Sequence, residues 1–138
     1  MRRYLLDTGI AGDLVFRRGP AVHHRARRTR EAGGHIGIAT PVLAELLFGA
    51  EYSPAPMENR QRVLRAVAKW THWPFDREAA LKYGWLAAEL KRSGRAMQQL
   101  DIAIAAIALN LGNCVVVSKD SDLRAVPGLT VEDWSQPE

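Results

Sequence analysis

Five acidic residues of this 138-residue chain lie where a predicted strand ends or a predicted helix begins. Asp7 follows the apolar run RYLL, and Asp120 and Asp122 follow the run CVVVS. Glu45 lies about one turn into TPVLAELLFG, and Asp101 stands near the start of QLDIAIAAIAL, an almost wholly apolar segment. A lone ionised carboxylate is costly to bury, so Asp101 implies either a cationic partner or an exposed position at the helix start.

Carboxylates that converge repel one another and raise one another's pKa unless a cation neutralises them. Oxygen ligands without His or Cys favour a hard divalent ion, Mg²⁺ or Mn²⁺. Such an ion can activate a water, stabilise a leaving oxygen and offset the charge of a phosphate, so the pattern fits phosphodiester hydrolysis. The single cysteine, Cys114, excludes a Cys-rich zinc site and an internal disulfide. No organic cofactor is expected.

Each acid also has a purely structural explanation when it is taken alone. Asp7 could cap the following helix, and Glu45 could be an exposed helix residue. Asp101 could be favoured in a first turn by the helix dipole, and Asp120 and Asp122 could be turn residues. The metal site is favoured because all five would have to gather at one sheet edge by coincidence.

Alternating strand and helix patterns are expected to position these acids. Strands are expected at residues 3–9, 35–40, 73–75 (WPF), 114–118 and 129–134. Helices are expected through 14–16, over the arginine-rich segment to Glu31, over 41–51, within 57–73, and over 76–94 and 99–112. Thr40 and Asp76 are the expected N-caps, with Pro41 in a first turn.

This order predicts one domain over residues 1–138. The fold class is α/β, a three-layer α/β/α sandwich around a mainly parallel sheet of four to five strands. In open sheets of this kind ligands bind outside the carboxyl ends of the strands, which is where the acids fall.

The net charge of +4 is unevenly distributed, since residues 1–30 hold eight arginines against two acids. Segment 17–30 forms either a solvated helix face or a phosphate-contacting surface, and composition leaves both open. His23 and His24 do not suit a paired general acid and base, because adjacent helix side chains point about 100° apart.

A targeting or membrane segment is not expected. Asp7 and Asp13 interrupt the apolar start of the chain, which argues against a signal peptide. Asp101 and Asn110 bracket the best candidate for a bilayer span, which is too short. With one cysteine, the chain suits a reducing cytoplasm.

Four motifs together resemble the PIN-domain ribonucleases, and most of all the VapC toxins of bacterial toxin–antitoxin pairs. They are YLLDTG, TPVLAELLFG, QLDIAIAAIAL and VVVSKDSDL, in the family's order and spacing over nearly the whole chain. The resemblance implies a PIN-like fold and a metal-dependent endoribonuclease that hydrolyses RNA with Mg²⁺ or Mn²⁺. It also implies a cognate antitoxin protein as partner and a homodimer as the assembly.

The resemblance further implies roles for particular residues. The positions that match the family's catalytic metal ligands are Asp7, Glu45, Asp101 and Asp120, with Asp122 as a fifth, shared or outer ligand. Thr8 and Ser118 match hydroxyl positions that orient a metal-bound water or ligand. The chain departs from the family at Gly9, where Asn or Ser is frequent, and at Leu123, where Phe is frequent.

Basic and aromatic residues supply the expected partner contacts. The arginines expected to contact the RNA backbone are Arg25, Arg27, Arg28 and Arg30, with the antitoxin as the alternative partner for the same surface. Arg95 and Lys119 are further candidates for phosphate contact. Exposed tryptophans could bind a partner, but Trp70 and Trp85 are expected in the core from their helical spacing.

Three rival classes are less well matched. A phosphoacceptor receiver domain requires two acids after the first strand and an Asp ending the third, whereas this chain offers only Asp7 and WPF. A haloacid-dehalogenase-type phosphatase requires a second Asp where Gly9 stands. A catalytically silent PIN-like module that only binds RNA or protein would have lost acids, and none is lost here.

Overall fold

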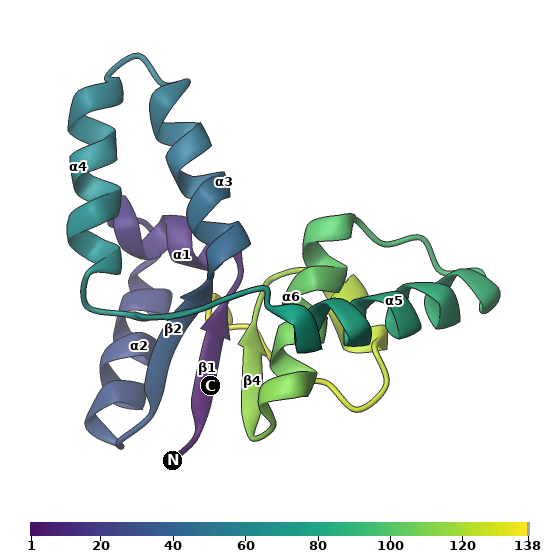
Figure 1. The fold of residues 1–138 in the computed structure, drawn as a ribbon. Coiled ribbons are helices and arrows are strands. Elements are labelled where there is room, and N and C mark those ends of the chain that lie inside the picture. The colour runs from purple at the N-terminus through teal and green to yellow at the C-terminus, as the bar shows by residue number, and fades with distance from the viewer. Residues whose placement is uncertain (138) are drawn as a thin grey trace.

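The computed structural model of the chain describes residues 1–137, which alternate strands and helices as expected (Figure 1). The strands are β1 (Arg3–Leu6), β2 (His35–Ala39), β3 (Thr71–Trp73), β4 (Cys114–Val117) and β5 (Thr130–Glu132). The helices are α1 (Thr8–Val15), α2 (Pro20–Glu31), α3 (Thr40–Glu51), α4 (Pro56–Val67), α5 (Arg77–Arg92) and α6 (Gln99–Leu111), and a 3₁₀ helix, η1, spans Ser121–Ala125.

The described strands form one parallel sheet in the order β3-β2-β1-β4-β5. The chain moves outward from β1 through β2 to β3, and then returns through α5 and α6 to β4 on the other side of β1. Right-handed crossovers in opposite directions place α1–α2 and α5–α6 on opposite faces of the sheet. In Figure 1, α3 and α4 form a hairpin that extends beyond the carboxyl ends of the strands. The expected three-layer α/β/α fold is confirmed.

The register of the sheet brings separate parts of the sequence to one edge. Leu6, the last residue of β1, pairs with Ile38 of β2 and with Val117 of β4. The N–H of Asp7 then donates to the carbonyl oxygen of Val117 at 3.0 Å, which continues the ladder by one residue. The residues that follow β1 and β4 therefore lie side by side.

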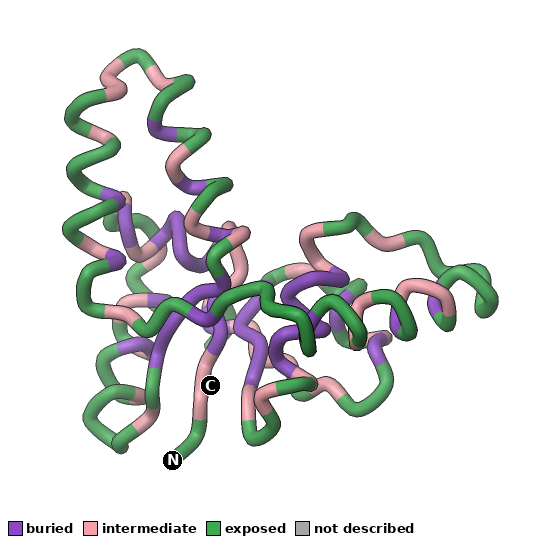
Figure 2. The backbone as a smooth tube through the Cα atoms, in the orientation of Figure 1, coloured by how far each residue is buried: buried purple, intermediate pink, exposed green. Residues whose placement is uncertain are grey.

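The core is built from the central strands and from α6. Leu5, Leu6 and residues 115–117 are fully buried, and residues 102–108 of α6 are buried without interruption. Figure 2 shows this concentration of buried positions on the central strands and on α6. A helix that is apolar on all sides must be covered on all sides, and α5 packs along α6. Among residues 1–137, no helix combines the length and apolarity needed to cross a membrane.

Several expected element boundaries differ from the structure. The first strand ends at Leu6 instead of residue 9, because Asp7 caps α1 and Thr8 begins that helix, and the last strand covers Thr130–Glu132 instead of 129–134. The third strand ends at Trp73 instead of covering 73–75, because Pro74 has no N–H to donate to a sheet ladder. Thr40 is the first residue of α3, and Ala39 is its N-cap, although Pro41 does stand in the first turn. Asp76 is confirmed as the N-cap of α5, where its Oδ1 accepts from the N–H of Ala79 at 2.9 Å.

The tryptophans are distributed differently from the expectation. Trp70 is partly buried and packs against the core, in line with the expectation, but Trp85 is 57% exposed; Trp73 and Trp134 are buried. Helical spacing identifies residues on one face but does not say which face meets the core. In α5 the buried face carries Ala79, Leu86 and Leu90, and Trp85 lies off it.

We predict that Gly37→Ala destabilises the protein, because β2 and β3 approach too closely for a side chain. A Cβ at Gly37 would collide with the carbonyl oxygen of Thr71 and lie 2.8 Å from the ring of Trp73. We expect the free energy of unfolding in urea to fall by about 1–3 kcal/mol. The control is Gly84→Ala, where a Cβ meets nothing within 4 Å. It should raise stability by about 0.5–1 kcal/mol. Equal effects of the two substitutions would contradict this packing.

Candidate metal centre

The five acids expected to converge line one cavity of about 270 Å³ at the carboxyl edge of the sheet. They come from the end of β1, from α3, from the first turn of α6 and from the segment after β4. The complete lining is Asp7, Thr8, Gly9, Glu45, Gln98, Leu100, Asp101, Asp120 and Asp122. Four separate parts of the chain thus supply carboxylates to one small volume.

Asp7 serves the fold and the cavity together. Its Oδ1 accepts from the N–H of Ile10 at 3.0 Å, which caps α1. Its Oδ2 accepts a hydrogen bond from the Oγ of Ser118 at the end of β4. The capping explanation is therefore correct for this residue, and the same residue also lines the cavity.

Ser118 connects the two strand ends at the cavity. This buried side chain donates to Asp7 and accepts from the N–H of Asp120 at 2.9 Å. Asp120 in turn caps η1, because its Oδ1 accepts from the N–H of Asp122 at 2.9 Å. These successive hydrogen bonds, centred on the buried Ser118, fix Asp7 relative to the loop that carries Asp120 and Asp122.

Asp101 and Glu45 approach the cavity from two helices. Asp101 is partly buried in the first turn of α6, directly before the continuous buried run of that helix. Glu45 is exposed in α3 and lines the cavity from there. Glu45 is thus an exposed helix residue that also lies at the cavity where the other acids gather.

The cavity carries more negative charge than nearby cations neutralise. Burial, followed by the neighbouring carboxylates of Asp120 and Asp7, raises the pKa of Asp101 to about 6. Burial also raises the pKa of Asp7, although the N–H of Ile10, the Ser118 hydroxyl and the Lys119 ammonium oppose the rise. Both groups would be more easily ionised if a cation were bound between them.

The donor atoms fit a hard divalent cation. Every polar side chain that lines the cavity offers an oxygen, and none offers imidazole nitrogen or sulfur. The Oγ1 of Thr8 is buried there and has no hydrogen-bond partner among the described residues. Within residues 1–137, no three His, Cys, Asp or Glu side chains are placed so that they could hold a metal ion together without moving. The cavity therefore offers suitable donors without a preassembled coordination shell.

Sequence reasoning did not anticipate an ion pair beside the cavity. Asp13, in α1, is only 9% exposed. Its carboxylate lies 2.9 Å from the Nζ of Lys119 and 3.4 Å from the Nε of Arg18. Gln98 and Leu100 were also missed as cavity-lining residues, and their position beside Asp101 in QQLD is the signal that could have identified them.

None of the arginines expected to contact RNA lines the carboxylate cavity. Arg25 pairs with Glu132 at 3.3 Å, and Arg25 and Arg28 line a hollow near the start of β1. Arg27 is exposed on α2. Arg95 is exposed and, like Lys119, does not line the cavity. The structure thus separates the basic surface from the acidic centre.

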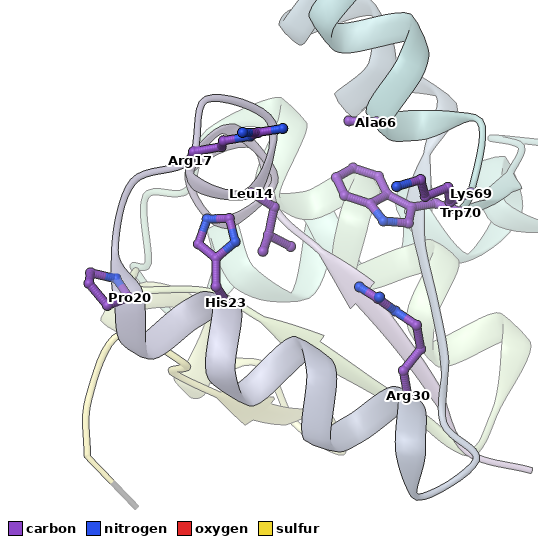
Figure 3. A pocket seen from close by; sticks show the side chains of 8 residues that line it. All are labelled: Leu14, Arg17, Pro20, His23, Arg30, Ala66, Lys69 and Trp70. Atoms are coloured by element: carbon purple, nitrogen blue, oxygen red, sulfur yellow. The ribbon is translucent and has the colours of Figure 1, made fainter.

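Arg30 belongs to a different hollow, of about 400 Å³, between α2 and the elements that flank it (Figure 3). Arg17 and Lys69 surround the same hollow, and Leu14 and Trp70 add apolar surface. His23 also lines it, with its Nε2 3.1 Å from the carbonyl oxygen of Asp13. His24, by contrast, is exposed and does not line this hollow.

We predict that the wild type loses stability as the pH rises in metal-free buffer, and that Asp101→Asn reduces this loss. The pKa of Asp101 is about 6 in the folded protein, against an ordinary value of 3.8. As pH rises from 3.8 to about 6, the unfolded chain ionises first, so the folded state loses stability and does not regain it at higher pH.

For this partly exposed carboxyl we expect a loss on the order of 1–2 kcal/mol, measured by denaturation between pH 4 and pH 7.5. Asp76→Asn, which keeps an N-cap outside the cavity, is the matched control and should retain the loss of stability that Asp101→Asn removes. An Asp101→Asn variant with the wild-type pH dependence would contradict the prediction.

Comparison with known proteins agrees with this geometry. The sequence model of the PIN domain family matches residues 4–129. The chain is 31% identical over 135 residues to the tRNA(fMet)-specific endonuclease VapC of Shigella flexneri, covering 98% of this chain and all of that relative.

Solved structures give the same result. The DNA-bound VapBC of Salmonella typhimurium superposes with a TM-score of 0.88 at 29% identity, over 97% of this chain and 99% of that chain. VapBC2 of Rickettsia felis, bound to a promoter DNA fragment, has a TM-score of 0.88 at 23% identity, over 96% and 98% of the two chains, and supports the fold. The chain therefore belongs to the PIN domain family and, within it, to the VapC group.

Proposed function

We propose that this chain is a metal-dependent endoribonuclease that hydrolyses RNA phosphodiester bonds and acts as the toxin of a toxin–antitoxin pair. The observation that carries the proposal is the gathering of four carboxylates, from Asp7, Glu45, Asp101 and Asp120, in one oxygen-lined cavity. Relatives that match over nearly the whole chain are named ribonucleases or endonucleases.

In this proposal the cofactor is Mg²⁺ or Mn²⁺, held by the four carboxylates with Asp122 as an outer ligand. When bound, the ion supplies an activated water and offsets the negative charge of the phosphate. The chain itself needs no nucleophilic side chain. Its contribution is to hold the carboxylates rigidly, Asp7 through Ser118 and Asp101 through the buried body of α6.

Thr8 and Ser118 have different proposed roles. Ser118 orients Asp7 and the start of the Asp120 loop by direct hydrogen bonds. Thr8 lines the cavity and its buried hydroxyl has no partner in the described residues, so we assign it to hold a water or substrate oxygen once its side chain turns toward the cavity. Satisfying this hydroxyl would remove the cost of leaving it buried and unpaired.

We propose that the exposed arginines of α2 contact the RNA backbone outside the cavity. Arg27, Arg28 and Arg30 are exposed there, and Arg25 is half-buried beside Glu132. Guanidinium groups on one helix can neutralise successive phosphates and release their counterions. In this arrangement the arginines hold the RNA strand outside the cavity, and the phosphodiester bond to be cleaved lies at the carboxylates.

We also propose a cognate antitoxin and a second copy of this chain as partners, in the cytoplasm. The related structures are toxin–antitoxin complexes named VapBC. The hollow of Figure 3, with Arg17, Arg30 and Lys69 around Trp70, suits an acidic and partly apolar antitoxin segment. Large apolar side chains such as Trp85, 57% exposed on α5, offer surface for self-association.

We predict that Asp7→Asn and Asp101→Asn each lower the rate of RNA cleavage at least about 100-fold while the fold is retained. EDTA should abolish cleavage by the wild type, and added Mg²⁺ or Mn²⁺ should restore it. The measurement is cleavage of a labelled RNA, with circular dichroism to check folding.

Asp76→Asn is the control for these substitutions, because it makes the same chemical change at a helix cap outside the cavity. It should cleave RNA at the wild-type rate. Cleavage that persists in EDTA, or a folded Asp7→Asn variant with full activity, would overturn the proposed mechanism. RNA binding without any cleavage by the wild type would support a silent binding module instead.

We predict that the double variant R27A/R28A binds RNA more weakly and with a smaller dependence on salt. Each lost contact to a single strand should reduce the slope of log affinity against log salt by about 0.7. Binding is measured in EDTA, so that the RNA stays intact. The double variant R77A/R92A removes two exposed arginines from α5 and should leave the slope unchanged. Equal slopes for both variants would move the RNA surface away from α2.

A further inference from the structure

An ion pair stands next to the carboxylate cavity without lining it. The Nζ of Lys119 lies 2.9 Å from Oδ2 of Asp13, whose side chain is 13% exposed. Lys119 is the residue between Ser118 and Asp120, both of which take part in the hydrogen-bond chain at the cavity. The pair therefore joins the second turn of α1 to the loop that follows β4.

The stem of Lys119 passes close to the carboxylates. A Cβ placed on Gly9 would lie 3.8 Å from Cε of Lys119 and 3.7 Å from Oδ1 of Asp7. Gly9 lines the cavity and has no side chain, so no side chain at this position separates the Lys119 stem from the site. The Lys119 ammonium already lowers the pKa of Asp7 from this position.

Hydrogen bonds that do not involve the Lys119 side chain hold the loop in place. Ser118 donates to Asp7 and its N–H donates to the carbonyl oxygen of Glu132 at 2.9 Å. The N–H of Asp120 and that of Asp122 are bonded within the loop. Lys119 itself has a side chain that is 47% exposed, so its ammonium can move if Asp13 stops holding it.

We propose that Asp13 is a positioning residue that keeps the Lys119 ammonium out of the carboxylate cavity. Without the Asp13 charge, the ammonium would turn toward Asp7 and neutralise it internally, in competition with a divalent cation. Asp13 thereby keeps the cavity's negative charge available for the metal. This inference rests on the proposed function, because it assumes that the cavity binds a divalent ion.

The test is calorimetric titration of Mn²⁺ into the full chain without RNA. Asp13→Asn should weaken Mn²⁺ binding about tenfold, since a charge within several ångströms changes a carboxylate's affinity for cations by that order. Lys119→Met should bind Mn²⁺ no more weakly than the wild type. The double variant D13N/K119M should recover the affinity of Lys119→Met, because the competing ammonium is gone.

Arg18→Met is the matched control. Arg18 also pairs with Asp13, at 3.4 Å, but its side chain is 64% exposed and belongs to the segment after α1. Its removal should leave Mn²⁺ affinity unchanged. As a second readout, Asp13→Asn should require more Mn²⁺ for half-maximal RNA cleavage, yet reach a near-wild-type rate at saturation.

Three results would overturn the inference. If Lys119→Met weakens Mn²⁺ binding as much as Asp13→Asn, the pair fastens the loop and does not sequester a charge. If the double variant stays as weak as Asp13→Asn, the carboxylate has a structural role only. If Asp13→Asn binds Mn²⁺ normally, Lys119 does not compete.

Two further outcomes are also decisive. Should Asp13→Asn fail to fold, Lys119→Met alone still tests the inference, because a weaker Mn²⁺ affinity than that of the wild type would mean that the pair fastens the loop. A wild type that binds no Mn²⁺ would overturn both the proposed function and this inference. A wild type that binds Mn²⁺, with an Asp13→Asn variant that binds it equally well, would overturn the inference alone.

Discussion

Repulsion among carboxylates at one edge of a parallel sheet is the constraint to which the rest of this structure responds. Burial, together with the nearby carboxylates of Asp120 and Asp7, raises the pKa of Asp101 to about 6. Such a cluster destabilises the chain that carries it unless a cation is bound. The fold must therefore supply both the stability that offsets this cost and the rigidity that keeps the cluster together.

Both come from apolar packing behind the site. The buried strands β1 and β4 end side by side, so that Asp7 and Ser118 meet through a register set by the core. The buried run of α6 fixes the helix whose first turn carries Asp101. An apolar segment around an acidic residue is then not a contradiction, because the same packing that cannot solvate the charge holds it in place.

Sequence patterns predicted what depends on local periodicity and strand order. The alternation of strands and helices predicted a parallel sheet, and the shared edge of a parallel sheet predicted the gathering of Asp7, Glu45, Asp101 and Asp120. The roles of these residues remain proposals. Trp85 was misplaced because spacing alone does not say which helix face meets the core. The Asp13–Lys119 pair joins residues 106 positions apart, and no periodicity in either segment signals such a contact.

The central claim is that the carboxylates gathered in this cavity bind a divalent cation. It is tested most directly by titrating Mn²⁺ at pH 6 in two buffers of different ionisation enthalpy, which counts the protons released on binding. With the pKa of Asp101 at about 6, binding should release about half a proton from this residue. Mn²⁺ binding without net proton release, or no binding at all, would contradict the account.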